Sequence, residues 1–274
     1  MDSKLILFRP QNCEDYLIGK IYAAFFLALA LFLSSPAHAN NSCQFKGTAE
    51  IIAKNPHEVQ ELWTMEDEPF LWDTVVPESS AFKSYINWVW GMTDPVQDNL
   101  IRIQREYFHS YPKMVKRFNL FLEGQVGTLF DARCFEMYLL ARHTASFPLE
   151  QRPSEFMAFI LRNKEQVNQL RVYFSSGDAN PDFSPPTSEL VLERIQNDLS
   201  QGWIFESHLH SHPFLKQVYP DFLGGTVVPS DGDISSFNFW AENTGLKEAW
   251  LTNGITTVKI PKTQFRTLLE TVQK

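Results

Sequence analysis

The second half of the sequence predicts a layered α/β or α+β fold, in which helices cover a sheet. Strand-like and helix-like segments alternate along residues 116–274, and this order is typical of a sheet covered by helices. The segment QLRVYFSS (169–176) alternates apolar and polar residues and is a predicted strand. The segment TSELVLERIQNDL (187–199) spaces its apolar residues along one helix face, with Ser188 as a candidate N-cap.

Three further segments of this half carry local signals. FDARCFEMYLLARHTASF (130–147) predicts a helix, with Asp131 as a candidate cap. GWIFESHLHSHP (202–213) predicts a strand. AWLTNGITTVKI (249–260) predicts two strands joined at the Asn-Gly pair 253–254, which is a strong hairpin signal. These segments complete the alternation from which the sheet is predicted.

Residues 40–115 form a predicted N-terminal extension that is mostly helical and rich in aromatic residues. Val59, Leu62 and Trp63 have helical spacing. A second helix is expected from Asp94, a good N-cap that is followed by proline. The tryptophans of this region either pack in the core or form a platform for a peptide or a carbohydrate.

The first 39 residues have the pattern of a secretory signal peptide. An apolar run at residues 21–33 follows Lys20, and small residues stand at Ala37 and Ala39, before the expected cleavage point. The run is shorter than the roughly 17–25 residues of a membrane-spanning helix. Cleavage of residues 1–39 would give a secreted or periplasmic chain without a membrane span, whereas a retained leader would anchor the chain.

The charge balance argues against a nucleic-acid partner. The formal net charge is −8, and the chain has no run of Lys and Arg that could neutralise phosphates. Removal of the leader leaves Cys43 and Cys134. An oxidising compartment favours a disulfide between them, and two unpaired, buried thiols are the alternative.

The segment FESHLHSHPF (205–214) indicates a metal site. His208, His210 and His212 are two residues apart, so a strand would place all three on one face. Imidazole nitrogens are good ligands for Zn²⁺. Pro213 cannot continue a central strand, so the strand is expected to end beside the histidines, where a loop can close over the ion.

A further ligand is available downstream, in the segment VVPSDGDISSF. Asp231 and Asp233 both offer carboxylates, and the Pro-Ser-Asp-Gly sequence predicts a tight turn before a helix. Ser230 could donate a hydrogen bond to an oxyanion that forms at the metal.

Together, HSHP and PSDGD resemble the motif of the JAMM, or MPN-plus, zinc metalloproteases. That motif reads His-Ser/Thr-His-Pro, a spacer, and Ser-x-x-Asp. The resemblance implies that His210, His212 and Asp233 bind zinc and that Ser230 holds the tetrahedral intermediate. His208 falls where the family has no ligand, which implies a supporting or structural role. Asp231 is also outside the motif and stays as a minor alternative ligand.

The resemblance also implies an upstream glutamate at the start of a strand. PSEFMAFIL (153–161) fits this place, and Glu155 would be the general base that takes a proton from the attacking water. Two alternatives remain. The segment could be one helix with Glu155 in its first turn, or Glu136 could be the base, although its surroundings favour a helix.

The resemblance covers residues 116–274, with a JAMM-like mixed sheet as the implied fold. Two features depart from the family: the spacer at residues 213–229 is long, and a predicted signal peptide precedes the domain. Family members mostly act on ubiquitin-like conjugates inside cells, so their substrates do not transfer. The sequence predicts an exported zinc-dependent peptidase or isopeptidase that acts on a peptide or protein. The alternatives are a non-catalytic zinc-binding or scaffold module of the cell envelope, and an envelope protein with a tryptophan-rich binding surface.

Overall fold

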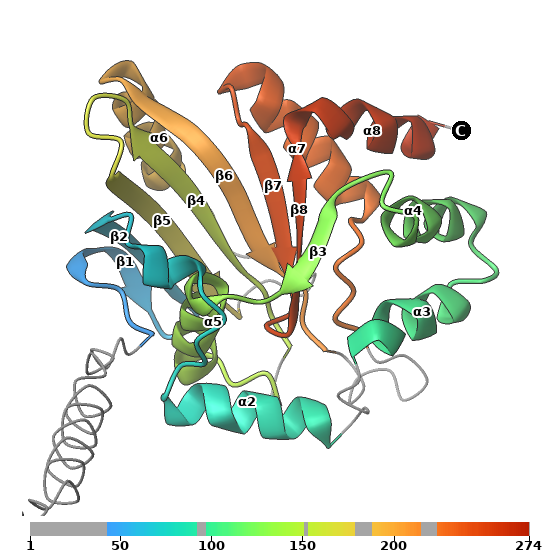
Figure 1. Ribbon diagram of the computed structural model, residues 1–274. Helices are drawn as coiled ribbons and strands as arrows, with labels where there is room; N and C mark the ends of the chain where they lie inside the picture. Colours follow the sequence, from blue (N-terminus) through green and yellow to red (C-terminus); the bar gives the residue numbers. More distant parts are fainter. Residues whose placement is uncertain (1–42, 92–96, 151–152, 179–187, 215–223, 274) are drawn as a thin grey trace, which may run out of the picture. The chain divides into compact units, whose positions relative to one another are not determined.

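A mixed sheet of eight strands forms the centre of the fold (Figure 1). The computed structural model describes residues 43–91, 97–150, 153–178, 188–214 and 224–273. In spatial order the strands are β1 (Gly47–Asn55), β2 (Glu58–Glu66), β5 (Gln169–Gly177), β4 (Phe156–Asn163), β6 (Trp203–Ser211), β7 (Glu248–Thr252), β8 (Thr256–Pro261) and β3 (Thr128–Asp131). Neighbouring strands are antiparallel except β6 and β7. The predicted mixed sheet is thus confirmed.

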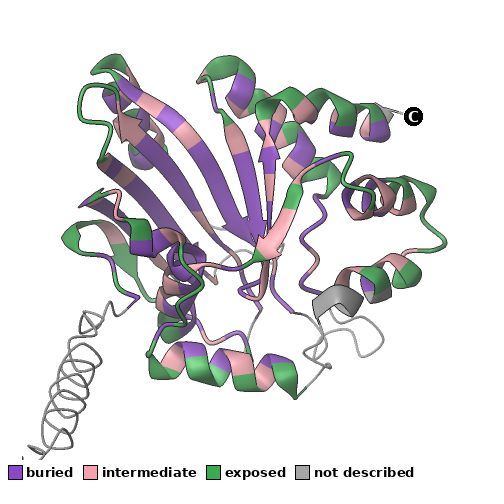
Figure 2. Ribbon diagram, viewed as in Figure 1, coloured by how far each residue is buried: buried purple, intermediate pink, exposed green. Residues whose placement is uncertain are grey.

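Helices cover both faces of the sheet. The described helices are α2 (Ser80–Trp90), α3 (Gln97–Tyr107), α4 (Pro112–Leu122), α5 (Cys134–Ser146), α6 (Glu189–Ser200), α7 (Asp231–Asn243) and α8 (Phe265–Gln273), with short 3₁₀ turns at Pro69–Trp72 and Lys262–Gln264. One hydrophobic core joins α2 and α5 to the sheet, and a second joins α4, α6, α7 and α8 to it. Figure 2 shows the central strands almost wholly buried between these layers.

Strand β4 shows how one strand supplies both cores. Ala158 and Ile160 belong to the core of α2 and α5, whereas Phe159 and Leu161 belong to the core of α7 and α8. Successive side chains of a strand point to opposite faces, so a run of consecutive apolar residues serves both layers. This also explains why β4 has an apolar run rather than an alternating pattern.

The helix predicted from the spacing of Val59, Leu62 and Trp63 is wrong, because these residues lie in strand β2. Leu62 and Trp63 are neighbours in sequence, yet they pack into opposite cores, as a strand requires. Strand β2 pairs with β1 on one side and with β5 on the other. Strands from both predicted regions, residues 40–115 and 116–274, therefore belong to one sheet.

Several local predictions can be compared with the structure. The hairpin of β7 and β8 is confirmed, and so is helix α6 with Ser188 as its cap. Asp131 is not a helix cap, because it ends strand β3, and α5 begins instead after Arg133. Asp94 and the leader at 1–39 lie outside the described residues.

The predicted disulfide between Cys43 and Cys134 is present, with the two Cα atoms 5.4 Å apart. It joins the segment before β1 to the first residue of α5. In the described ranges, no helix has the length and apolar character that a membrane crossing requires.

Candidate metal centre

The centre begins at the end of strand β6. His208 and His210 lie within this strand, and His212 follows it directly. The backbone N–H of His212 donates to the carbonyl of Thr252 at 2.9 Å, which extends the pairing of β6 with β7 by one residue. Strand β6 is a central strand between β4 and β7. His210 near its end and His212 just beyond it are therefore held on a rigid part of the fold.

The N-terminus of helix α7 supplies the carboxylate. Ser230 is the N-cap of this helix, and its hydroxyl oxygen accepts from the backbone N–H of Asp233 at 3.2 Å. The Asp233 carboxylate in turn accepts from the backbone N–H of Ser230 at 2.6 Å. This reciprocal capping box satisfies two backbone donors of the first helical turn, and it fixes the direction in which Asp233 points.

The side chains of His210, His212 and Asp233 converge on one point. The two Nε2 atoms are 3.0 Å apart, and the carboxylate oxygens of Asp233 lie 3.1 Å from His210 Nε2 and 3.4 Å from His212 Nε2. Ligand atoms that each lie about 2.0–2.1 Å from a tetrahedral zinc ion are separated by roughly 3.3 Å. These separations therefore fit one small cation. Within the described residues, no other three His, Cys, Asp or Glu side chains meet in this way.

The second ring nitrogen of His212 has its own partner. Nδ1 lies within hydrogen-bond distance of the Thr226 carbonyl oxygen, which can only accept. In the neutral ring, this contact favours the tautomer that carries its hydrogen on Nδ1, which leaves the lone pair of Nε2 for a cation. Thr226 acts through its backbone, and no side-chain pattern in the sequence could have indicated it.

The charges of the cluster shift the pKa values of Asp233 and His212. Burial alone would raise the pKa of Asp233, but His210 and His212 outweigh burial and hold it well below its usual range. Burial likewise lowers the pKa of His212, but the Asp233 carboxylate outweighs this effect and raises it to about 9. A cation that binds Nε2 of His212 must displace a proton from the ring. The Asp233 carboxylate supplies negative charge that favours either the proton or the cation.

Glu155 lies beside this cluster, at the start of strand β4. Residues 156–163 form a strand, so the alternative of one helix across this segment is wrong. The backbone N–H of Phe156 donates to the hydroxyl of Ser211 at 3.0 Å, which ties the start of β4 to the end of β6. Burial raises the pKa of Glu155; His212 and His210 lower it, and Asp233 raises it. The net upward shift suits a carboxylate that gains and releases a proton.

The other candidate residues have different surroundings. His208 is 3% exposed and stacks on Phe159 with ring centres 4.9 Å apart; its ring centre also lies 5.6 Å from that of His210, but it is not one of the three converging side chains. The carboxylate of Asp231 binds the guanidinium of Arg117. Glu136 is fully buried in the first turn of α5, where it accepts from the backbone and side chain of Arg133.

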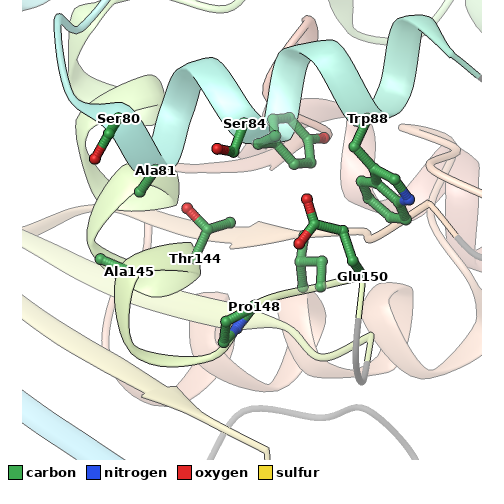
Figure 3. A pocket seen from close by; sticks show the side chains of 10 residues that line it. Ser80, Ala81, Ser84, Trp88, Thr144, Ala145, Pro148 and Glu150 are labelled. Carbon is green, nitrogen blue, oxygen red and sulfur yellow. The ribbon is translucent and has the colours of Figure 1, made fainter.

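Two of the cavities in the described part of the chain open elsewhere. One, of about 520 Å³, has Val227 and Asn253 in its wall. These residues directly follow Thr226 and Thr252, whose backbone carbonyls contact His212. The other, of about 330 Å³, lies between α2 and α5 (Figure 3). Figure 3 shows Trp88 and Thr144 facing this cavity with Glu150, which belongs to the segment that leads to Glu155. No side chain of the cluster lines either cavity.

Comparisons with known proteins gave no match to any protein-family model, to any curated protein or to any solved structure.

Proposed function

We propose that the chain is a zinc-dependent peptidase or isopeptidase that hydrolyses an amide bond in a peptide or protein. The observation that supports this most strongly is the convergence of His210, His212 and Asp233 at 3.0–3.4 Å, with Glu155 at their side. Two imidazoles and one carboxylate are a donor set that Zn²⁺ favours in catalytic sites, where a fourth position stays open.

A zinc ion held by these three side chains would polarise the substrate carbonyl and make a nearby water more acidic. The residues of the chain then account for the proton. Glu155 accepts a proton from the water while the water oxygen bonds to the carbonyl carbon. It then returns the proton to the amide nitrogen as the C–N bond breaks. The raised pKa of Glu155 supports this role, because the carboxylate must both take up and release the proton.

Ser230 is proposed to stabilise the oxyanion. Its hydroxyl oxygen already accepts from the Asp233 backbone, so the hydroxyl hydrogen is left to donate to another group. The residue is exposed at the start of α7, which a substrate carbonyl can reach. A hydrogen bond to charge that develops in the transition state contributes more to the rate than to substrate binding.

Export of the chain is part of the same proposal. The signal-like pattern at residues 1–39 supports it, and the disulfide between Cys43 and Cys134 is of the kind that persists in oxidising compartments.

The substitution Glu155→Gln tests the function. It removes the proton acceptor while keeping the shape of the side chain and all three candidate ligands. We expect the purified variant to bind Zn²⁺ as the wild type does, but to lose hydrolysis of a panel of fluorogenic peptides and lysine-linked isopeptides by at least about 100-fold. Glu165→Gln, an exposed glutamate just beyond the far end of β4, is the matched control and should be fully active.

Two results would contradict the proposal. Persistent cleavage by Glu155→Gln would remove Glu155 from the mechanism. Zinc binding without hydrolysis by the wild type, across the whole panel, would instead favour the non-catalytic zinc-binding module.

A further inference from the structure

Arg117 is a buried charged residue that the proposed mechanism does not use. It lies on helix α4, and its side chain is 1% exposed. Its Nε donates to the hydroxyl of Thr271 on α8 at 2.7 Å. The guanidinium also donates to the Pro229 carbonyl at 3.3 Å and to the Asp231 carboxylate, and it contacts the sulfur of Met114 at 3.5 Å.

Two of these contacts lie on either side of the cap of α7. Pro229 and Asp231 directly flank Ser230, whose hydroxyl and backbone form the capping box with Asp233. Ser230, Asp231 and Gly232 are exposed. Without the contacts of Arg117, this first turn would open more easily, because exposed helix ends fray. The guanidinium therefore holds the turn from its buried side while Asp233 faces the histidines.

Stability alone does not account for a charge at this position. Arg117 lies in the helix that contributes Phe118 and Phe121 to the hydrophobic core. A buried ion pair is often no more stabilising than an apolar side chain of similar volume. A guanidinium does, however, have a planar set of donors that can bind two acceptors in a fixed geometry.

We propose that Arg117 is a positioning residue for the metal ligand Asp233, because it fixes the Pro229–Asp231 turn from which that carboxylate is presented. This inference rests on the proposed zinc site. It also gives Asp231 a role: its carboxylate is an anchor for Arg117 rather than a ligand.

The test compares zinc binding by the full chain and its variants. Zinc affinity is measured by competition with a chromophoric chelator, and the visible spectrum of the Co²⁺-substituted protein reports the ligand geometry. The variants are Arg117→Met, Arg117→Lys and Asp231→Asn; the Asp231 side chain is 57% exposed, so the last change leaves the core intact. Loss of a residue that orients a ligand typically weakens metal binding by roughly 10–100-fold, and we expect this of Arg117→Met, together with a changed Co²⁺ spectrum.

The other variants refine the expectation. Arg117→Lys should fall between wild type and Arg117→Met, because one ammonium cannot bind both acceptors in the fork geometry. Asp231→Asn should weaken zinc binding less than Arg117→Met, and the double variant should be no weaker than Arg117→Met alone, because the two side chains act as one unit.

Arg171→Met is the matched control. Arg171 forms an ion pair with the buried Asp198, and it lies five positions along β5 from Ser176, the residue opposite Phe156. We expect this variant to lose stability in urea but to bind zinc within about twofold of wild type, because distant sites act independently.

The outcomes separate this inference from the proposed function. If the wild type binds zinc, while Arg117→Met and Asp231→Asn keep its affinity and its Co²⁺ spectrum, the positioning role is wrong and the zinc site stands. If Arg117→Met does not fold, an unchanged Asp231→Asn overturns the inference by itself. If the wild type binds no zinc, the proposed function fails and this inference fails with it.

Discussion

The buried His143 and the pair of His210 and His212 lie close to strand β4 but have different environments. His143 projects from α5, and each of its ring nitrogens has a partner: the Ser176 hydroxyl at 2.8 Å and the Ser154 carbonyl at 3.1 Å. His210 and His212 instead direct their Nε2 atoms at each other and at the carboxylate of Asp233. His143 is thus a core residue with both ring nitrogens hydrogen-bonded, whereas His210 and His212 have the geometry of metal ligands.

The pKa values express the same contrast. Burial lowers the pKa of His143 to about 4, and the Ser154 carbonyl and the Asp178 carboxylate offset only part of this effect. Burial also lowers the pKa of His212, but Asp233 reverses the effect and raises it to about 9. Burial alone therefore does not mark a functional histidine. A carboxylate that converges with two imidazole nitrogens distinguishes the cluster.

Removal of a ligand should break this contrast most strongly. We expect His210→Ala to reduce zinc affinity by more than the roughly 100-fold that loss of a ligand-orienting residue can cost, because only two of the three side-chain ligands remain. His143→Gln should bind zinc like the wild type. Competition with a chromophoric chelator measures both. Equal zinc affinity in His210→Ala and the wild type would show that the cluster is not the metal site.

The candidate site was predictable from the sequence because its residues lie in short local patterns. His210 and His212 have strand spacing, Ser230 and Asp233 have the spacing of a capping box, and Glu155 precedes an apolar run. Each pattern is read within a few residues. The fold then brings the three segments together, and the resemblance to a known motif supplied that step in advance.

The contacts that support the site were not predictable in the same way. Arg117 and Asp231 are 114 positions apart in sequence, and no local pattern links them. Thr226 acts through a backbone carbonyl, which every residue has. Leu62 and Trp63 of β2 pack into different cores. A strand buried on both faces loses its alternating pattern, so the apolar spacing of this segment also fits a helix.

Low pH should destabilise the fold through His143. The pKa of His143 is about 4 in the folded state and near 6.5 in the unfolded chain. Between these values the unfolded chain binds a proton that the folded chain does not, so the free energy of unfolding falls as pH falls. This histidine alone accounts for a loss of about 3 kcal/mol between pH 6.5 and pH 4.

The matched variant isolates this loss. His143→Gln keeps a hydrogen-bonding side chain but has no titratable group, so its stability should depend less on pH across the same window. Urea unfolding at several pH values, with a chelator present to remove metal effects, measures the difference. Parallel pH profiles for wild type and variant would contradict the assignment of His143 as a neutral core residue.

The smallest effect is expected at His208, whose ring contacts that of His210 but which is not among the three converging side chains. It is 3% exposed and stacked on Phe159, and within the described part of the chain neither ring nitrogen has a hydrogen-bond partner. Phe has a similar shape and leaves no buried polar atom unpaired, so we expect His208→Phe to be neutral or to stabilise the fold by about 1 kcal/mol. Zinc affinity should be unchanged. A loss of zinc binding, measured beside urea unfolding of the same variant, would instead make His208 part of the metal centre, because a purely structural side chain would alter stability alone.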